Sequence, residues 1–293
     1  MSKKHLVFII NPKSGVERQK EIKQGIDDCL DQDQYSYEIL HTEFAKHGIV
    51  LAKEAARNGA YAVVAVGGDG SVNDVVQGLL GTNTLLAIIP KGSGNGMART
   101  MGIPLDTREA IKLINHGNIR AMDVGYANGS PFISNAGVAF DALISKKFAK
   151  SERRGFWMYS WLVTKYMWLY KNWDWTITVD GKEMKERAFM VNVANGQQFG
   201  YNFKIAPMAD YTDGVLDVII IRKFPKILGG TIVVRALNGS IKGSPFVRHL
   251  TGKEITISNP GLRLMQTDGD AHACDPSITF TIKQGAQRVI VPA

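Results

Sequence analysis

The sequence is poor in cysteine and has no long apolar run. Its two cysteines, Cys29 and Cys274, form no Cys-x-x-Cys pair, so neither a disulfide framework nor a zinc site is indicated. No run of about 18 apolar residues occurs, so no membrane-spanning helix is predicted. The apolar stretch near Met1 is too short for a signal peptide. These absences favour a protein of the reducing cytoplasm.

Two catalytic signatures are also missing. The six histidines show no His-Glu-x-x-His spacing, which is the signature of a zinc protease. No Gly-x-Ser-x-Gly occurs either, and this motif carries the nucleophile of many serine hydrolases. Neither class of hydrolase is therefore predicted.

What the chain does have is a basic balance of charge. It carries 35 lysines and arginines against 27 acidic residues, a formal net charge of +8, in a chain that is 45% hydrophobic. This composition is typical of a globular protein, and 293 residues suffice for one large domain or two smaller ones. The charge favours anionic partners, which include nucleotides, nucleic acids and anionic membranes, without choosing among them.

The most informative stretch is the glycine-rich segment Gly67–Asn73. It follows Tyr61–Val66, a valine-rich run typical of a buried parallel strand, and a helix is predicted from about Ser71. Glycines and a helix N-terminus together favour a bound phosphate, although a simple tight turn is the alternative. The segment is neither a P-loop nor a dinucleotide fingerprint. Asp69 beside a phosphate implies a bridging divalent metal or a role in accepting a proton.

Two further apolar strands end in similar turns. Leu6–Ile10 is followed by Asn11–Gly15, and Leu85–Pro90 is followed by Lys91–Gly96. Ligands of open α/β sheets bind at the carboxyl ends of the strands. The three turns therefore predict one anion-binding site at a shared edge of a parallel sheet.

After Asp123 the pattern changes from strands alternating with helices to mostly strand-like segments separated by turns, and this change predicts two domains. Residues 1–124 are expected to form an α/β domain, and residues 125–293 a larger, mostly antiparallel β-rich domain. A return of the last strand to the first domain stays open. The later strands are expected at 131–136, 175–179, 188–194, 215–221, 254–258, 278–283 and 288–291.

All five tryptophans lie within residues 153–175. Trp157, Trp161 and Trp168 occupy neighbouring positions of a predicted helix. Just upstream, five basic residues are predicted to share one helical face: Lys146, Lys147, Lys150, Arg153 and Arg154. Aromatic and basic residues together are typical of a membrane interface, whereas a core-packing helix with a solvated basic face is the alternative. Docking on a membrane is the hypothesis that these residues support.

Taken together, the motifs resemble the diacylglycerol kinase catalytic family, which includes bacterial lipid kinases and the sphingosine and ceramide kinases. The matching segments span nearly the whole chain in the family's order: Asn11-Pro12-x-Ser14-Gly15, Gly67–Asn73, Pro90-x-Gly92-Ser93-Gly94-Asn95, Asp123-Val124-Gly125, Asn135-Ala136-Gly137-x-x-x-Asp141, Asp213-Gly214-x-x-Asp217 and Asp268-Gly269-Asp270.

The resemblance implies an active site in a cleft between the two domains. There the γ-phosphoryl group of ATP would pass, with Mg²⁺, to a hydroxyl of a diacylglycerol-like or sphingoid lipid, in a role such as phospholipid biosynthesis. The residues that it assigns to the nucleotide are Asn11, Pro12, Lys13, Ser14, Gly15, Thr42, Gly67, Gly68, Asp69, Gly70, Ser71, Val72, Asn73, Gly92, Ser93 and Asn95.

The resemblance also assigns the acidic residues. Asp69 and Asp123 would organise catalytic Mg²⁺, and Asp213, with backbone oxygens near Asp210 and Val215, would hold a structural metal. The catalytic candidates are Asp69, Asp268 and Asp270, with the identity of the base left open.

The chain departs from the family pattern in two places. Gly96 stands where many bacterial members have Asp, and the terminal motif has Asp270 in place of the usual Glu. The first departure removes one carboxylate from the implied Mg²⁺ network, and the second shortens the reach of another.

Two alternatives share parts of the pattern. NAD kinases and phosphofructokinases also carry Gly-Gly-Asp-Gly, and Gly96 is the best support for a protein that binds nucleotide or lipid without turnover. The expected partner is a lipid at a membrane surface, reached by peripheral association from the cytoplasm. Nucleic acid is not expected, and a homodimer stays open.

Overall fold

The computed structural model describes residues 3–12, 16–151, 155–200 and 202–293. Contacts divide the chain into two compact units. The first, here the α/β unit, comprises Met1–Met122 and Gly285–Ala293, and the second, here the β-rich unit, comprises Asp123–Gln284.

Four parallel strands form the centre of the α/β unit. They are β1 (Lys4–Ile10), β2 (Tyr35–His41), β3 (Ala62–Gly67) and β4 (Leu85–Pro90), in the order β4-β3-β1-β2. Both β3 and β4 are buried along their whole length, as expected of apolar strands covered on both faces. Because the strands are parallel, the turns that follow them lie along one edge of the sheet.

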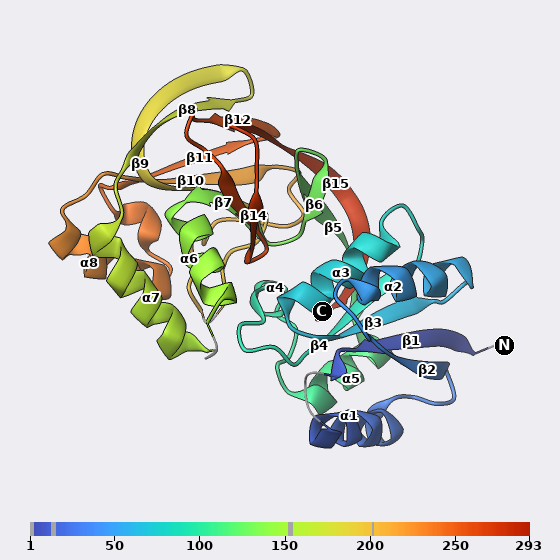
Figure 1. Ribbon diagram of the computed structural model, residues 1–293. Helices are drawn as coiled ribbons and strands as arrows, with labels where there is room; N and C mark the ends of the chain where they lie inside the picture. Colours follow the sequence, from blue (N-terminus) through green and yellow to red (C-terminus); the bar gives the residue numbers. More distant parts are fainter. Residues whose placement is uncertain (1–2, 13–15, 152–154, 201) are drawn as a thin grey trace. The chain divides into compact units, whose positions relative to one another are not determined.

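Helices cover both faces of this sheet (Figure 1). On one side lie α2 (His47–Arg57) and α3 (Asp69–Leu79), and on the other lie α1 (Val16–Cys29) and α5 (Thr107–His116). The short helix α4 (Gly96–Thr100) follows β4. α5 begins where the Asp106 carboxylate accepts a hydrogen bond from the Glu109 amide at 3.0 Å, which satisfies a free donor at the helix start.

The β-rich unit contains mostly antiparallel strands. Its elements are β5 (Asn118–Ala127, which begins in the α/β unit), β6 (Ser130–Phe132), β7 (Asn135–Ala139), β8 (Trp173–Val179), β9 (Lys182–Ala194), β10 (Leu216–Arg222), β11 (Val247–Gly252), β12 (Glu254–Ser258), β13 (Leu264–Thr267), β14 (Asp270–Ala273) and β15 (Ser277–Val291). β9 is central, because it pairs with β7, β8 and β10.

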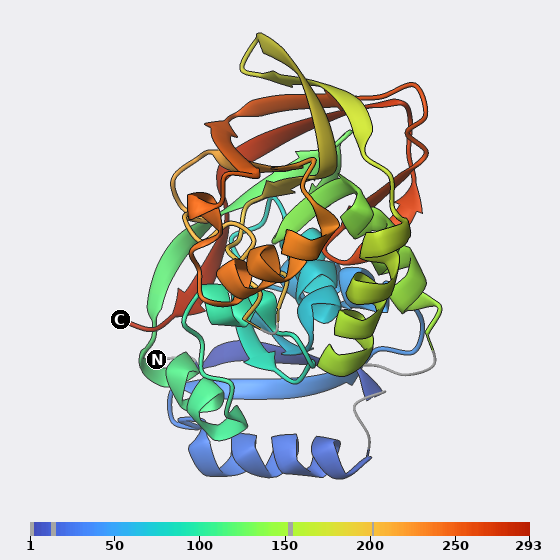
Figure 2. The same ribbon diagram turned by 90° about the vertical axis from the view of Figure 1, so that its left-hand side faces the viewer.

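Strand β10 shows how the sequence builds two cores from one apolar run. Leu216, Val218 and Ile220 enter a cluster formed by strand side chains, whereas Ile219 and Ile221 enter a second cluster. The period of two in a strand sends alternate residues to opposite faces. The second cluster is covered by α6 (Phe140–Ala149), α7 (Phe156–Leu169) and α8 (Gly229–Leu237), which Figures 1 and 2 show on one side of these strands.

The fold class predicted from the sequence is confirmed, and the element boundaries differ in detail. The segment 131–136, expected as one strand, covers the end of β6 and the start of β7, which are separate strands. The two strands expected at 278–283 and 288–291 form the single strand β15, which continues through Gly285 at a φ of +60°. Residues of β15 pair with β12 near one end, and Val289 pairs with Leu86 of β4.

The tryptophan-rich segment also contains more than one element. Trp157, Trp161 and Trp168 lie on α7, whereas Trp173 and Trp175 lie on β8. α6 ends at Ala149, so the predicted basic face does not continue along one helix, and Arg153 and Arg154 lie outside the described residues. In the described part of the chain, no helix has the length and apolarity needed to cross a bilayer.

Candidate active site

Two glycine turns contact each other at the edge of the α/β sheet. A Cβ on Gly68 would lie 3.1 Å from the Gly92 Cα, and a Cβ on Gly92 would lie 2.4 Å from the Gly68 Cα. The Lys91 amide donates to the Gly67 carbonyl at 2.8 Å, which joins the two turns. Only glycine permits this approach, so the two motifs form one structure although they are far apart in the sequence.

Asn95 closes the second turn. Its Oδ1 accepts a hydrogen bond from the Gly92 amide at 2.9 Å, and its Nδ2 donates to the Gly92 carbonyl at 2.8 Å. The residue adopts a left-handed backbone with φ of +51°, which Asn tolerates better than most residues. Asn95 therefore stabilises the turn that contains Ser93.

The Asp69 carboxylate lies where the two turns meet. Its Oδ2 accepts a hydrogen bond from the Gly96 amide and its Oδ1 one from the Met97 amide, both at 3.0 Å. These bonds fix the carboxylate at the start of α4. A carboxylate has about four lone-pair sites, so two N–H donors leave acceptor capacity for a cation or a proton.

The start of α3 is suited to a phosphate. The helix begins at Asp69, with Gly68 as its N-cap in an extended conformation, two residues before the predicted start. The first amides of a helix have no intrahelical acceptor, and the helix dipole is positive there. The amides of Gly70 and Ser71 are therefore candidates for binding phosphate oxygens, as the sequence predicts.

Three further predicted nucleotide residues, Asn11, Pro12 and Thr42, follow the ends of strands β1 and β2. Asn11 and Pro12 follow β1, and the Thr42 amide after β2 donates to the Ile10 carbonyl at 3.0 Å. Lys13, Ser14 and Gly15 lie outside the described residues. Val72 is buried in α3 at 2% exposure, so its side chain has a packing role.

In the β-rich unit, four aspartates gather around one turn. The buried Asp123 accepts a hydrogen bond from the Gly214 amide at 2.7 Å, and Asp213 accepts one from the Val215 amide at 3.1 Å. Burial, together with the negative charges of Asp217, Asp210 and Asp123, raises the pKa of Asp213. The structure thus brings together the residues predicted for the structural metal, and it places Asp123 with them.

The predicted magnesium residues were compared with the ligands that this ion needs. Among the described residues, no three His, Cys, Asp or Glu side chains form a group that could hold a metal alone. Mg²⁺ is usually bound by one or two carboxylates, with phosphates and waters as further ligands, which suits Asp69 beside a phosphate turn. At Asp213, burial is the main cause of the raised pKa, and the nearby charges of Asp217, Asp210 and Asp123 add to it.

Asp268 and Asp270 differ sharply although both were predicted as catalytic. The Asp268 carboxylate accepts three backbone N–H bonds, from Ile133 at 2.8 Å, Ser134 at 2.7 Å and Asn135 at 3.1 Å. This arrangement ties the β13–β14 turn to the segment before β7, so Asp268 has a clear positioning role. Asp270, at the start of β14, is exposed.

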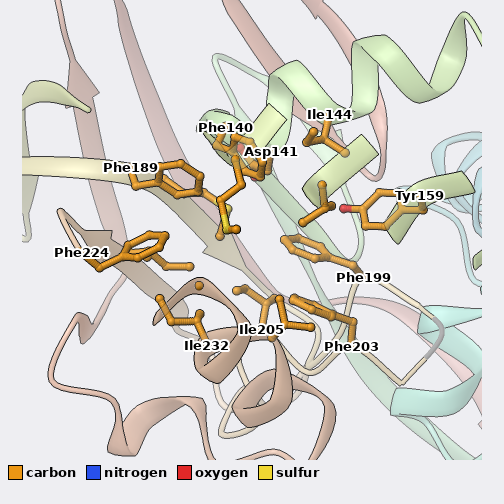
Figure 3. Close-up of a pocket in the computed structure, with 16 residues that line it drawn as sticks. Phe140, Asp141, Ile144, Tyr159, Phe189, Phe199, Phe203, Ile205, Phe224 and Ile232 are labelled. Atoms are coloured by element: carbon orange, nitrogen blue, oxygen red, sulfur yellow. The ribbon is translucent and has the colours of Figure 1, made fainter. Parts of the chain in front are cut away.

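The β-rich unit contains a hollow that no sequence motif predicts (Figure 3). Its enclosed volume is about 60 Å³, and about 550 Å³ when the space open to solvent is included. Apart from Asp141, the lining side chains are aliphatic, aromatic or methionine, with Gly229 among them: Phe140, Ile144, Tyr159, Val163, Met167, Phe189, Met190, Phe199, Phe203, Ile205, Ile221, Phe224, Ile232 and Val233.

Asp141 is a buried acid in the wall of this hollow. Its Oδ2 accepts hydrogen bonds from Asn192 Nδ2 at 3.0 Å and Gln266 Nε2 at 3.3 Å, and its Oδ1 accepts one from the Ala142 amide at 2.8 Å. Burial raises the pKa of Asp141 to about 7, against the lowering effect of these bonds. The neutral acid is therefore favoured over a pH range in which an exposed aspartate is ionised.

We expect Asp141→Asn to flatten the pH dependence of stability. A carboxyl whose pKa is raised on folding contributes stability that is full below its ordinary pKa of 3.8 and is lost as pH rises through about 7. The wild-type free energy of unfolding should therefore fall between pH 5 and 7 by at most about 1.4 kcal/mol per pH unit from this group. Urea denaturation at several pH values measures the slope. Asp275→Asn, at an exposed site, is the control, and an unchanged slope in Asp141→Asn would refute the assignment.

Comparison with known proteins finds a matching protein family for each half of the chain. The profile of the diacylglycerol kinase catalytic domain matches residues 5–127. That of the YegS C-terminal NAD kinase beta sandwich-like domain matches residues 134–291. A diacylglycerol kinase of Bacillus subtilis (strain 168) is 30% identical over 272 residues, covering 90% of this chain and 88% of that protein.

Two further comparisons extend the similarity. A protein of Chromohalobacter salexigens named "Probable lipid kinase YegS-like" is 29% identical over 229 residues, which covers 76% of this chain and 74% of that protein. The crystal structure of a diacylglycerol kinase from Bacillus anthracis str. Sterne shares the fold, with a TM-score of 0.75 at 23% identity, covering 99% of this chain and 98% of that one.

These similarities show that the chain is a lipid kinase. It belongs to the diacylglycerol kinase catalytic family, and the resemblance seen in its motifs is confirmed. Membership of a kinase family implies the use of ATP as phosphoryl donor.

Proposed function

We propose that this lipid kinase transfers the γ-phosphoryl group of ATP to a hydroxyl of a diacylglycerol-like or sphingoid lipid whose hydrocarbon chain enters the hollow of the β-rich unit. The observation that carries the proposal is the hollow itself, because its aromatic and aliphatic wall offers a lipid chain the burial that a soluble acceptor would not need. Phosphoryl transfer then requires the acceptor hydroxyl and the ATP phosphates to reach the same reaction centre.

The α/β unit supplies the phosphate-binding part of the reaction. The amides at the start of α3 would bind phosphate oxygens, and the Gly68–Gly92 contact would let the nucleotide approach the backbone closely. Mg²⁺, when bound, neutralises charge on the transferring phosphate, and Asp69 would hold it there. Positioning and charge neutralisation of this kind provide most of the rate in phosphoryl transfer.

The lipid hydroxyl also needs a proton acceptor. Asp69 retains acceptor capacity beyond its two N–H bonds, whereas three N–H donors already engage Asp268. Asp270 is exposed and carries the shorter side chain of the two acids found at this position in the family pattern. The hydrogen bonding therefore favours Asp69 or Asp270 as the base, with Asp268 positioning the β13–β14 turn.

The test is mass spectrometry of a mixed lipid panel after incubation with the protein, ATP and Mg²⁺. The panel contains diacylglycerols, monoacylglycerols and sphingoid bases, with NAD as a soluble competitor. One or more lipids should gain a phosphate. Phosphorylated NAD without any lipid product would favour the NAD kinase-like alternative, and bound nucleotide without any product would favour the inactive binding protein.

A membrane surface is the proposed partner of the helices around the hollow. Trp157 and Trp168 on α7 are 84% and 59% exposed, while Val163 and Met167 of the same helix line the hollow. Ile227, beside α8, is 82% exposed. Exposed large apolar side chains on adjacent elements are typical of an interaction surface, and tryptophan favours the headgroup region of a bilayer.

Basic residues accompany these apolar side chains. Lys165 Nζ lies 4.7 Å from the ring centroid of Trp161, which is 53% exposed. Each Lys or Arg close to an anionic bilayer contributes about 1 kcal/mol of attraction. The combination favours an anionic membrane, from which a lipid chain would have a short path into the hollow.

Replacing Trp157, Trp161 and Trp168 together by Ala should weaken binding to anionic vesicles. The loss should be at least about 10-fold, because the apolar area removed corresponds to more than about 1.4 kcal/mol. Co-sedimentation with phosphatidylglycerol-containing vesicles measures it. The control, Ile119→Ala, removes an exposed apolar side chain of the α/β unit and should leave binding unchanged. Equal binding by the triple variant and the wild type would refute this surface.

A further inference from the structure

An exposed aromatic pair follows β2 in the α/β unit. Phe44 is 60% exposed, and its ring stacks on the imidazole of His47 with centroids 4.1 Å apart and planes 14° apart. The Glu43 amide donates to His47 Nδ1 at 3.1 Å, so this nitrogen is the acceptor and the proton of the neutral ring is on Nε2. The backbone thus holds the imidazole, and the imidazole supports the phenyl ring as a flat surface open to solvent.

Two contacts tie the segment around this pair to β1 and to α3. Just before it, the Thr42 amide donates to the Ile10 carbonyl at the end of β1. Just after it, Gly48 packs against α3, where a Cβ on Gly48 would lie 3.0 Å from the Asp74 Cβ. The pair therefore follows the carboxyl end of β2, next to β1, and lies at the start of a helix that packs against α3.

We propose that Phe44, supported by His47, is the stacking platform for the purine base of the nucleotide. This inference rests on the proposed binding of ATP phosphates at the Gly68 and Gly92 turns. β2 lies two strands from β3, about 10 Å at the usual strand spacing, so a nucleotide extended along this edge from those phosphate turns would direct its base toward β2.

The chemistry of the pair fits a base better than a phosphate or a lipid headgroup. A phenyl face offers apolar area and stacking to any aromatic ring, whereas it offers a phosphate nothing. Stacking on an aromatic side chain tolerates every base because each has a π-face. Phe44 therefore contributes affinity for the nucleoside part and little selectivity between adenine and guanine.

Calorimetric titration with ADP and with inorganic pyrophosphate tests the platform. Phe44→Ala should weaken ADP binding about 10-fold, within the range measured for base stacking, and leave pyrophosphate binding unchanged. Phe44→Trp should restore ADP binding. Leu105→Ala, which removes another exposed apolar side chain of the α/β unit, is the control and should change neither ligand. Unchanged ADP affinity in Phe44→Ala, or an equal loss for both ligands, would overturn the proposal.

The titration separates this proposal from the proposed function because it uses no lipid. ADP binding that depends on Phe44, in a protein that phosphorylates no lipid, would support the platform and reject the lipid acceptor. Lipid phosphorylation together with ADP binding that ignores Phe44 would do the reverse. Phe44 is largely exposed, and thermal unfolding curves that coincide with the wild type verify that the variants are folded.

Discussion

Asp69→Asn is expected to reduce the rate of phosphoryl transfer by at least about 100-fold. The substitution preserves size and one oxygen but removes the negative charge that would hold Mg²⁺ or accept the hydroxyl proton. The new amide group would also face one of the two backbone donors, Gly96 or Met97, that now bind the carboxylate. Initial rates with γ-labelled ATP and the lipid identified by mass spectrometry measure the effect.

Asp106→Asn is the matched control for this experiment. Asp106 is also an aspartate whose carboxylate accepts a backbone N–H at a helix start of the α/β unit, and it is exposed. Its replacement should leave the rate within about twofold, because Asn caps helices nearly as well as Asp. Full activity in Asp69→Asn would remove Asp69 from both of its proposed roles.

Asp268→Ala is expected to lower the free energy of unfolding by about 3 kcal/mol or more. The change removes the acceptor of three backbone N–H groups, and each bond to a charged group contributes about 1.5–3 kcal/mol when it is shielded from water. Asp268 is partly buried, so water would replace part of that loss. Chemical denaturation measures the difference, with the exposed Asp270→Ala as the control that should keep wild-type stability.

The same pair of variants addresses catalysis. If Asp268 only positions the turn, a stabilised background or low temperature should recover much of its activity. If Asp270 is catalytic, Asp270→Ala should instead lower the rate of phosphoryl transfer and leave the free energy of unfolding unchanged. Asp268→Ala with unchanged stability and no activity would contradict the positioning role.

Much of the fold could be predicted from short patterns in the sequence. The valine-rich run at 61–66 and the glycines that follow predict a buried strand and a phosphate turn, and both β3 and the start of α3 are where this pattern places them to within two residues. The sequence predicted that the turns at Gly68 and Gly92 lie at the same edge of the sheet, but it did not predict that they contact each other. Their approach depends on the register of β3 and β4, which no short stretch of sequence specifies.

Local patterns predicted the exposed tryptophans of α7 as a membrane surface, but they did not predict the hollow beside them. The wall combines α6, α7 and α8 with residues of β9 and β10, which come from segments far apart in the chain. The sequence around Ile227 and Val234 does not predict that these apolar side chains are exposed, because their exposure depends on how α8 and the segment before it pack. The hydrogen bonds of Asp268 could not be predicted for a similar reason, because its three donors lie more than 130 residues away, whereas its predicted catalytic role stays a prediction.

The most direct measurement is a crystal structure of the protein with ADP and Mg²⁺. The phosphates should lie within hydrogen-bonding distance of the amides at the start of α3, beside Gly68 and Gly92, with Asp69 facing the metal. The base should lie on Phe44. Density for ADP at a site remote from Asp69 would contradict the assignment of these turns to the nucleotide, and with it the proposed reaction.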